Sequence, residues 1–241
     1  MTNPSLQAVP TPSPMEPSQK RLSTKAFVIY IAAFFVVWSL RATVFIHIDE
    51  SITSDAGKNV YSNALKLTLW VLPALITLAA LRMKPLNYLK LTTPLSTRGL
   101  IVSALVVFVW LSLVVFGESL IQSKSIGVLL SRKAPLWLGI LAGVFLSPIW
   151  EEILFRGFFL NRLNESVSFW KSNLISAFLF ALVHAPYWVS KNGFSGPVIK
   201  DLVNVFLLGC LFGWVMKKTN SLWPAIGAHI ANNFVSGLIH T

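Results

Sequence analysis

Seven apolar runs dominate the sequence and restrict the folds open to it. They span approximately residues 26–46, 64–81, 100–117, 135–160, 172–189, 200–216 and 221–239. A helix needs about 20 apolar residues to cross the hydrocarbon core of a bilayer, and the runs are close to that length. They lack the alternation of apolar and polar residues that a membrane β-barrel requires. The sequence therefore predicts an all-α, polytopic transmembrane helix bundle of about seven spanning helices.

The number of spans has a range of six to eight, because the fourth run is long and a break near Trp150 is an open alternative. The composition, 54% hydrophobic and 12% charged, is too apolar for an ordinary soluble domain. The net charge of +11 comes from residues between the runs that form no continuous basic stripe. We therefore expect a lipid bilayer, and no nucleic acid, as the partner. The single cysteine, Cys210, excludes an internal disulfide and a cysteine zinc site.

Three regions follow from the order of the runs. Residues 1–25 hold five prolines and little apolar surface, so they are predicted to be a disordered N-terminal tail. Residues 26–134 hold the first three transmembrane helices. Residues 135–240 hold the remaining helices and the motifs that carry chemistry.

Lys and Arg counts in alternate loops predict the orientation, because cytoplasmic loops retain the excess. With the N-terminus in the cytoplasm, twelve lie inside and six outside, with Arg41 and Lys66 left out because they fall within runs. The inner set is Lys20, Arg21, Lys25, Arg82, Lys84, Lys90, Arg98, Arg156, Arg162, Lys171, Lys217 and Lys218. The predicted location is the bacterial inner membrane, with a cytoplasmic N-terminus.

The first motif is Glu151-Glu152-x-x-x-Arg156, within an apolar run. Glu152 and Arg156 are four residues apart, so they share a helix face and can form an ion pair. Glu151 points about 100° away and has no cation at i+3 or i+4, which predicts a carboxylate free to act on water. Pro148 is expected to disrupt the helix ladder and help open a polar pocket. The alternative is a solvated helix end that carries all three charges.

Two further motifs place polar groups at membrane depth. Phe180-x-x-x-His184 lies in the fifth run, where Pro186 indicates a kink or a helix end and Phe180 is a candidate floor of a pocket. His229-x-x-x-Asn233 in the last run places an imidazole and an amide on one helix face. Taken alone, His184 is also consistent with a histidine that only packs in the core. The His229-x-x-x-Asn233 motif alone is also consistent with polar contacts that hold two helices together.

Together these groups suffice for hydrolysis of an amide inside a bilayer. Glu151 would act as general base, with His184 orienting the water. His229 and Asn233 would donate hydrogen bonds to the tetrahedral oxyanion. No cofactor is expected, but Glu151, His184 and His229 are also a donor set for catalytic zinc, and this alternative stays open.

The three motifs, in this order within residues 135–237, resemble the family of CAAX prenyl proteases and bacteriocin-processing enzymes. This family is related to the type II CAAX prenyl endopeptidase of the eukaryotic endoplasmic reticulum. The resemblance implies an intramembrane endopeptidase with a metal-independent glutamate mechanism. The residues that it assigns to catalysis are Glu151, His184, His229 and Asn233, with Glu152 and Arg156 in support; Phe180 joins the support as a packing residue.

The expected partner is a protein or peptide substrate with a membrane-proximal cleavage site. Bacteriocin processing and immunity are among the roles that the resemblance brings with it. A non-catalytic immunity or scaffold protein of the same fold remains an alternative, because a motif alone does not prove turnover. A small transporter is disfavoured, since its related halves are not found in the sequence.

Overall fold

The computed structural model describes residues 21–122 and 142–240, and within these ranges it contains helices and no strand. The predicted tail lies mostly outside the described residues. The first helix, α1, spans Thr24–Thr43, and the Ser23 hydroxyl caps it by accepting a hydrogen bond from the Ala26 amide at 3.2 Å. The all-helical prediction is confirmed.

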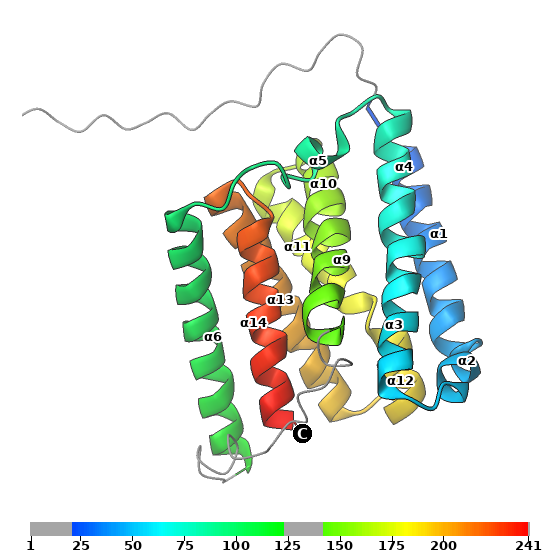
Figure 1. The fold of residues 1–241 in the computed structure, drawn as a ribbon, viewed down its shortest axis with the longest axis vertical. Coiled ribbons are helices and arrows are strands. Elements are labelled where there is room, and N and C mark those ends of the chain that lie inside the picture. The colour runs from blue at the N-terminus through cyan, green and yellow to red at the C-terminus, as the bar shows by residue number, and fades with distance from the viewer. Residues whose placement is uncertain (1–20, 123–141, 241) are drawn as a thin grey trace, which may run out of the picture.

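The helices pass back and forth along one direction, as Figure 1 shows. Helix α1 runs down to the short α2, and the chain returns upward through α3, η1 and α4. Helix α6 then descends, and the segment from α9 to α10 ascends between α3 and α14. The further elements are α2 (Ile46–Ser51), α3 (Asp55–Lys66), η1 (Leu67–Val71), α4 (Leu72–Ala80), α5 (Pro85–Tyr88), α6 (Thr97–Gln122), η2 (Ala142–Leu146), α9 (Ser147–Glu152), η3 (Ile153–Leu160), α10 (Asn161–Asn164), α11 (Phe169–Leu182), α12 (Ala185–Asn192), α13 (Gly196–Thr219) and α14 (Trp223–His240).

Five stretches within the described residues are helical, long and apolar enough to cross a membrane. They are Thr24–Thr43, Ala56–Ala80, Thr97–Gly117, Phe169–Asn192 and Gly196–Thr219. The predicted run 135–160 begins outside the described residues, and run 221–239 forms α14. These two segments carry the polar motif residues Glu151, His229 and Asn233. The protein is a polytopic integral membrane protein.

The fourth run is not broken at Trp150. The backbone keeps right-handed helical angles at Glu152 and Ile153, where α9 continues into the π-helical segment η3. Pro148 lies in the first turn of α9, directly after the π-helical segment η2. Proline removes one amide donor, so the predicted disturbance of the ladder appears as a change of helical type rather than as a break.

An aromatic core holds this segment against the N-terminal helices. Phe34 of α1 lies edge-on to Trp70, with ring centroids 5.6 Å apart, and to Phe159 at 5.9 Å. Trp70 in turn contacts Phe155 at 5.7 Å, and all four side chains are buried. Edge-to-face aromatic pairs add to the free energy of apolar burial, so this cluster fixes η3 beside η1.

Helices α11 and α13 pack closely because small residues face each other. A Cβ atom on Gly209 would lie 2.9 Å from Ala177 Cβ, and one on Gly213 would lie 1.9 Å from Asn173 Oδ1. Asn173 Nδ2 donates to the carbonyl of Cys210 at 2.9 Å, which joins the two helices within the bundle. Small residues permit this approach in membrane proteins, where van der Waals contact drives helix association.

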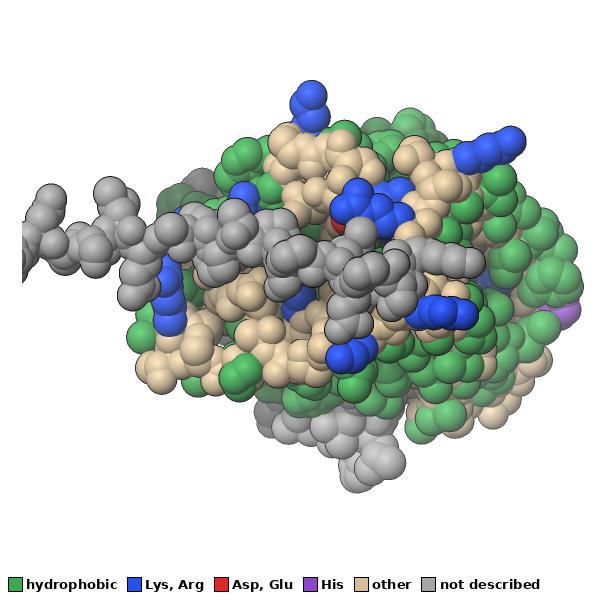
Figure 2. Space-filling view, turned by 90° about the horizontal axis from the view of Figure 1, so that it is seen from above, with side chains coloured by type: hydrophobic (Ala, Val, Ile, Leu, Met, Phe, Trp, Pro, Cys, Tyr) green, Lys and Arg blue, Asp and Glu red, His purple; other side chains and the backbone are tan. Residues whose placement is uncertain are grey.

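Lys and Arg side chains gather at the end of the bundle where α4 ends and α6 begins (Figure 2). The loops meet there through Lys90 Nζ, which donates to Asn220 Oδ1 at 2.8 Å, and Tyr88 OH, which donates to Glu165 Oε1 at 2.6 Å. Arg156, which the loop count included, is 1% exposed within η3. Its inclusion was wrong, because this guanidinium belongs to the interior.

Candidate active site

Glu151 and Glu152 lie side by side in sequence at the end of α9, with 4% and 0% of their surfaces exposed. The alternative of a solvated helix end is therefore wrong. Two adjacent buried carboxylates require partners, because an unpaired charge is costly in a low dielectric.

The predicted pair between Glu152 and Arg156 is confirmed. Arg156 Nη1 lies 2.9 Å from Glu152 Oε1, and both side chains are at most 1% exposed. The guanidinium carbon lies 4.2 Å from the centroid of the Phe180 ring and 5.4 Å from that of Phe212. The pair thus joins η3 to α11 and α13 through charge and cation–π contacts.

Glu151 is not the unpaired carboxylate that the sequence predicted. Lys66, the last residue of α3, places its Nζ 2.5 Å from Glu151 Oε1. Ser147 Oγ donates to the same oxygen at 2.8 Å, and the Lys66 ammonium also donates to Ser147. The prediction considered only partners on the same helix, whereas this cation comes from another helix.

Lys66 and Ser147 are the residues that the sequence reasoning missed. A signal for Lys66 was present, since an ionisable group inside an apolar run is a functional candidate by default. Ser147 lies four residues before Glu151, a spacing that puts both side chains on one helix face.

His229 of α14 lies between the two carboxylates. Its Nδ1 is 2.8 Å from Glu152 Oε1, and its Nε2 is 3.6 Å from Glu151 Oε2. Its ring stacks on Phe212, with centroids 4.8 Å apart, and 4% of the residue is exposed. The Nδ1–H donates to the Glu152 carboxylate, which leaves Nε2 facing Glu151.

His184 lies in the interruption between α11 and α12, with Pro186 in the first turn of α12, as the sequence predicted. Its Nδ1 donates to the carbonyl of Phe180 at 2.7 Å. That bond fixes the tautomer and leaves Nε2 with a lone pair.

The Phe180 ring joins the two imidazoles. Its centroid lies 5.1 Å from that of His184 and 5.7 Å from that of His229, edge-on to both. Phe180 is 2% exposed and lies in the hydrophobic core. The structure thus brings together Glu151, Glu152, Arg156, Phe180 and both histidines.

Asn233 has different contacts. Its Oδ1 accepts a hydrogen bond from Asn232 Nδ2 at 3.2 Å, and the residue is half-buried. This bond leaves the Asn233 Nδ2 hydrogens available to donate. Asn232, 8% exposed, is the more deeply buried amide of the two.

The zinc alternative was tested on the donor geometry. Within residues 21–122 and 142–240, no group of three His, Cys, Asp or Glu side chains converges as metal ligands would. One oxygen of Glu151 is taken by Lys66 and Ser147, and His229 Nδ1 is taken by Glu152. Glu151 Oε2, His229 Nε2 and His184 Nε2 are not engaged by these bonds.

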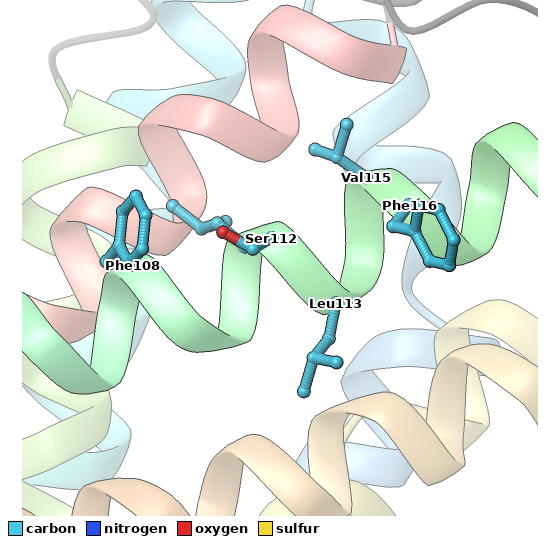
Figure 3. A pocket seen from close by; sticks show the side chains of 6 residues that line it. Phe108, Ser112, Leu113, Val115 and Phe116 are labelled. Atoms are coloured by element: carbon cyan, nitrogen blue, oxygen red, sulfur yellow. The ribbon is translucent and has the colours of Figure 1, made fainter.

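An apolar hollow along α6 holds none of these residues. It is lined by Phe108, Leu111, Ser112, Leu113, Val115 and Phe116. In Figure 3, Phe108 and Leu113 point to different sides of α6, and both side chains are exposed. Such a surface is expected of a helix that faces lipid tails.

These features define a class of protein: a polytopic α-helical membrane protein that buries two carboxylates, two imidazoles and an arginine where three helical segments meet. Residues 133–235 match the family model described as "Type II CAAX prenyl endopeptidase Rce1-like". This part of the chain, which holds all three motifs, is therefore similar to the CAAX membrane proteases.

A curated relative gives the same indication at greater distance. The chain is 30% identical over 94 residues to the "Putative membrane peptidase YdiL" of Bacillus subtilis (strain 168). The match covers 39% of this chain and 34% of that protein, so the chain spans about a third of the length of the relative. No solved structure matches the chain.

Proposed function

We propose that the protein is an intramembrane endopeptidase that hydrolyses a peptide bond with water activated by Glu151 and His184. The proposal rests on the different contacts of the two carboxylate oxygens of Glu151. Oε1 accepts from Lys66 and Ser147, whereas Oε2 faces His229 Nε2 across 3.6 Å. Oε2 is the oxygen left to take a proton.

The chemistry begins with a water that donates one hydrogen to Glu151 Oε2 and the other to His184 Nε2. Transfer of the first proton to Glu151 lets the hydroxide oxygen attack the carbonyl carbon of the substrate. The C–N bond then breaks, and the protonated Glu151 returns its proton to the leaving amine. The products are a carboxyl terminus and a free amine, so one water is consumed for each bond cut.

The oxyanion needs hydrogen-bond donors that are fixed before the reaction. Asn233 Nδ2 is such a donor, because only the Oδ1 atom of its amide is engaged by Asn232. His229 donates to Glu152 through Nδ1. It must therefore also carry a proton on Nε2 to serve the oxyanion, which makes the imidazolium its active form.

The proposed substrate is a protein or peptide with a cleavage site near the membrane. The name of the matching family refers to prenylated CAAX proteins, and nothing in the site requires a prenyl group. No cofactor is part of the proposal. A non-catalytic immunity or scaffold protein with the same fold is the second candidate, since motif residues alone do not prove turnover.

Mass spectrometry of new peptide termini tests turnover even while the substrate is unidentified. The full chain and its Glu151→Gln variant would each be reconstituted into vesicles with solubilised membrane proteins from a strain that lacks the gene. We expect new termini with the unmodified chain that are absent with the variant. Identical termini in both samples would refute the protease and favour the scaffold.

The proposed location is the bacterial inner membrane, with the basic end of the bundle in the cytoplasm. Single cysteines at Asn87 and Ser51, in a Cys210→Ala background, lie at opposite ends of the bundle. A membrane-impermeant maleimide should label Ser51→Cys in intact cells and leave Asn87→Cys unlabelled until lysis. The reverse pattern would invert the orientation.

A further inference from the structure

Lys66 has an unusual position for a lysine. It lies inside the candidate span Ala56–Ala80, and only 13% of its side chain is exposed. Near the helix ends a lysine extends its ammonium toward water, but here the ammonium turns inward to Glu151 and Ser147. An ionisable group that faces the interior at this depth usually has a function.

The backbone around the site explains how the ammonium reaches Glu151. Lys66 ends α3 just before η1, Ser147 begins α9 just after η2, and Glu152 ends α9 just before η3. Each of these positions is a junction between α- and π-helix. A π-turn rotates the side chains that follow it, and such turns are frequent at functional sites.

We infer that Lys66 is a positioning residue for the reaction, which rests on the function proposed above. Its ammonium and the Ser147 hydroxyl both bind Glu151 Oε1, so they fix the rotation of the carboxylate and aim Oε2 at the water. The positive charge also compensates the burial of the Glu151 carboxylate, 2.5 Å away, in a low dielectric.

A serine nucleophile activated by lysine would need the opposite arrangement. In such a dyad the amine is neutral and takes the proton of the hydroxyl. Here Lys66 Nζ lies 2.5 Å from a carboxylate oxygen, which favours the ammonium, and the Ser147 hydroxyl donates to that same oxygen. The geometry thus assigns Lys66 to Glu151 rather than to Ser147.

Kinetics separate a positioning role from a structural one. The substrate would be a synthetic peptide that carries a fluorophore and a quencher. Its sequence would be that of the site cut most strongly in the mass-spectrometry experiment on new peptide termini. Lys66→Met should lower kcat by about a hundredfold with KM nearly unchanged, because a misaimed base slows only the chemical step. Lys66→Arg keeps the charge and should recover at least about tenfold of that loss.

The matched control is Lys58→Met, the same change at an exposed position of α3. It should leave kcat unchanged. A kcat of Lys66→Met within about twofold of the unmodified chain, or an equal loss in Lys66→Arg and Lys66→Met, would overturn the inference.

Thermal unfolding tests the ion pair without any reference to activity. Lys66→Met leaves Glu151 as a buried unpaired charge and should lower Tm by about 5 °C or more. Adding Glu151→Gln to that variant removes the charge and should restore most of the loss. If Lys66→Met does not fold but the double variant does, the pairing is supported equally well. If the Tm losses of the two substitutions simply add, the pairing is refuted.

The two experiments distinguish the failures. If Glu151→Gln cleaves normally, the proposed function fails. The Tm values of Lys66→Met and the double variant would then still test the ion pair between Lys66 and Glu151. If Glu151→Gln is inactive and Lys66→Met is fully active, the proposed function stands and the role of Lys66 fails.

Discussion

His229 Nδ1 lies 2.8 Å from Glu152 Oε1, the same oxygen that Arg156 Nη1 contacts at 2.9 Å. One carboxylate oxygen therefore receives hydrogen bonds from α14 and from η3. The other oxygen, Glu152 Oε2, has no partner among the described residues, nor has Arg156 Nη2. Glu152 thus fixes the orientation of His229 while it neutralises Arg156.

Glu152→Ala should destabilise the protein strongly. The substitution leaves the Arg156 guanidinium buried without a counter-charge, and breaking one partner of a buried pair costs about 3–5 kcal/mol. Thermal unfolding in detergent measures the change. Glu165→Ala, which removes a partly exposed carboxylate 3.7 Å from Arg162, is the control and should have a much smaller effect. Equal shifts in the two variants would contradict the buried role of Glu152.

Gly213→Ala should weaken the contact between α11 and α13. The added Cβ would lie 1.9 Å from Asn173 Oδ1, so the Asn173 side chain, which donates to the Cys210 carbonyl, must shift at a cost of about 1–3 kcal/mol. Gly227→Ala is the matched control, because a Cβ there meets nothing within 4 Å. A lower Tm in Gly213→Ala alone is the expected outcome. Unchanged unfolding of both variants would show that this close approach is not required.

Metal removal should leave activity intact. The proposed reaction uses Glu151 as the base and His184 to orient the water, so it has no step that depends on zinc. Cleavage by the purified chain would be followed during titration with a chelator such as 1,10-phenanthroline. Loss of cleavage that added zinc restores would reverse this conclusion and make the metal essential.

Acidification should release the contact between α2 and α12. Lys191 donates a hydrogen bond to Glu50 Oε1, and this bond lowers the pKa of Glu50 below its ordinary value. A carboxyl whose pKa is lowered on folding contributes stability above its unfolded value, about 4.3, and loses it as the pH falls through the folded value. Hydrogen exchange should show α2 amides losing protection below about pH 4.

Glu50→Gln provides the control for that loss. The neutral amide cannot titrate, so the variant should show low α2 protection already at neutral pH, with little further change on acidification. The same pH response in Glu50→Gln as in the unmodified chain would assign the effect to another group. Because the pair is exposed, the change should remain local to α2 and α12.

The site was partly predictable for a local reason. Residues four apart on a helix share a face, so the pair of Glu152 with Arg156 followed from spacing alone. The interruption at His184 followed in the same way from Pro186. The partner of Glu151 did not follow, because Lys66 is 85 residues away and approaches only through the packing of α3 against α9.

The sequence by itself determined that the chain is a helical membrane protein, since apolar runs of spanning length leave the backbone no other way to satisfy its hydrogen bonds in lipid. It also singled out Glu151, His184 and His229 as polar residues within the apolar runs. Only the tertiary structure decided how they pair: Glu151 with Lys66, and His229 with Glu152. The physical reason is that a buried charge is costly unless a counter-charge lies beside it. Helix packing, rather than position along the chain, decides which counter-charge that is.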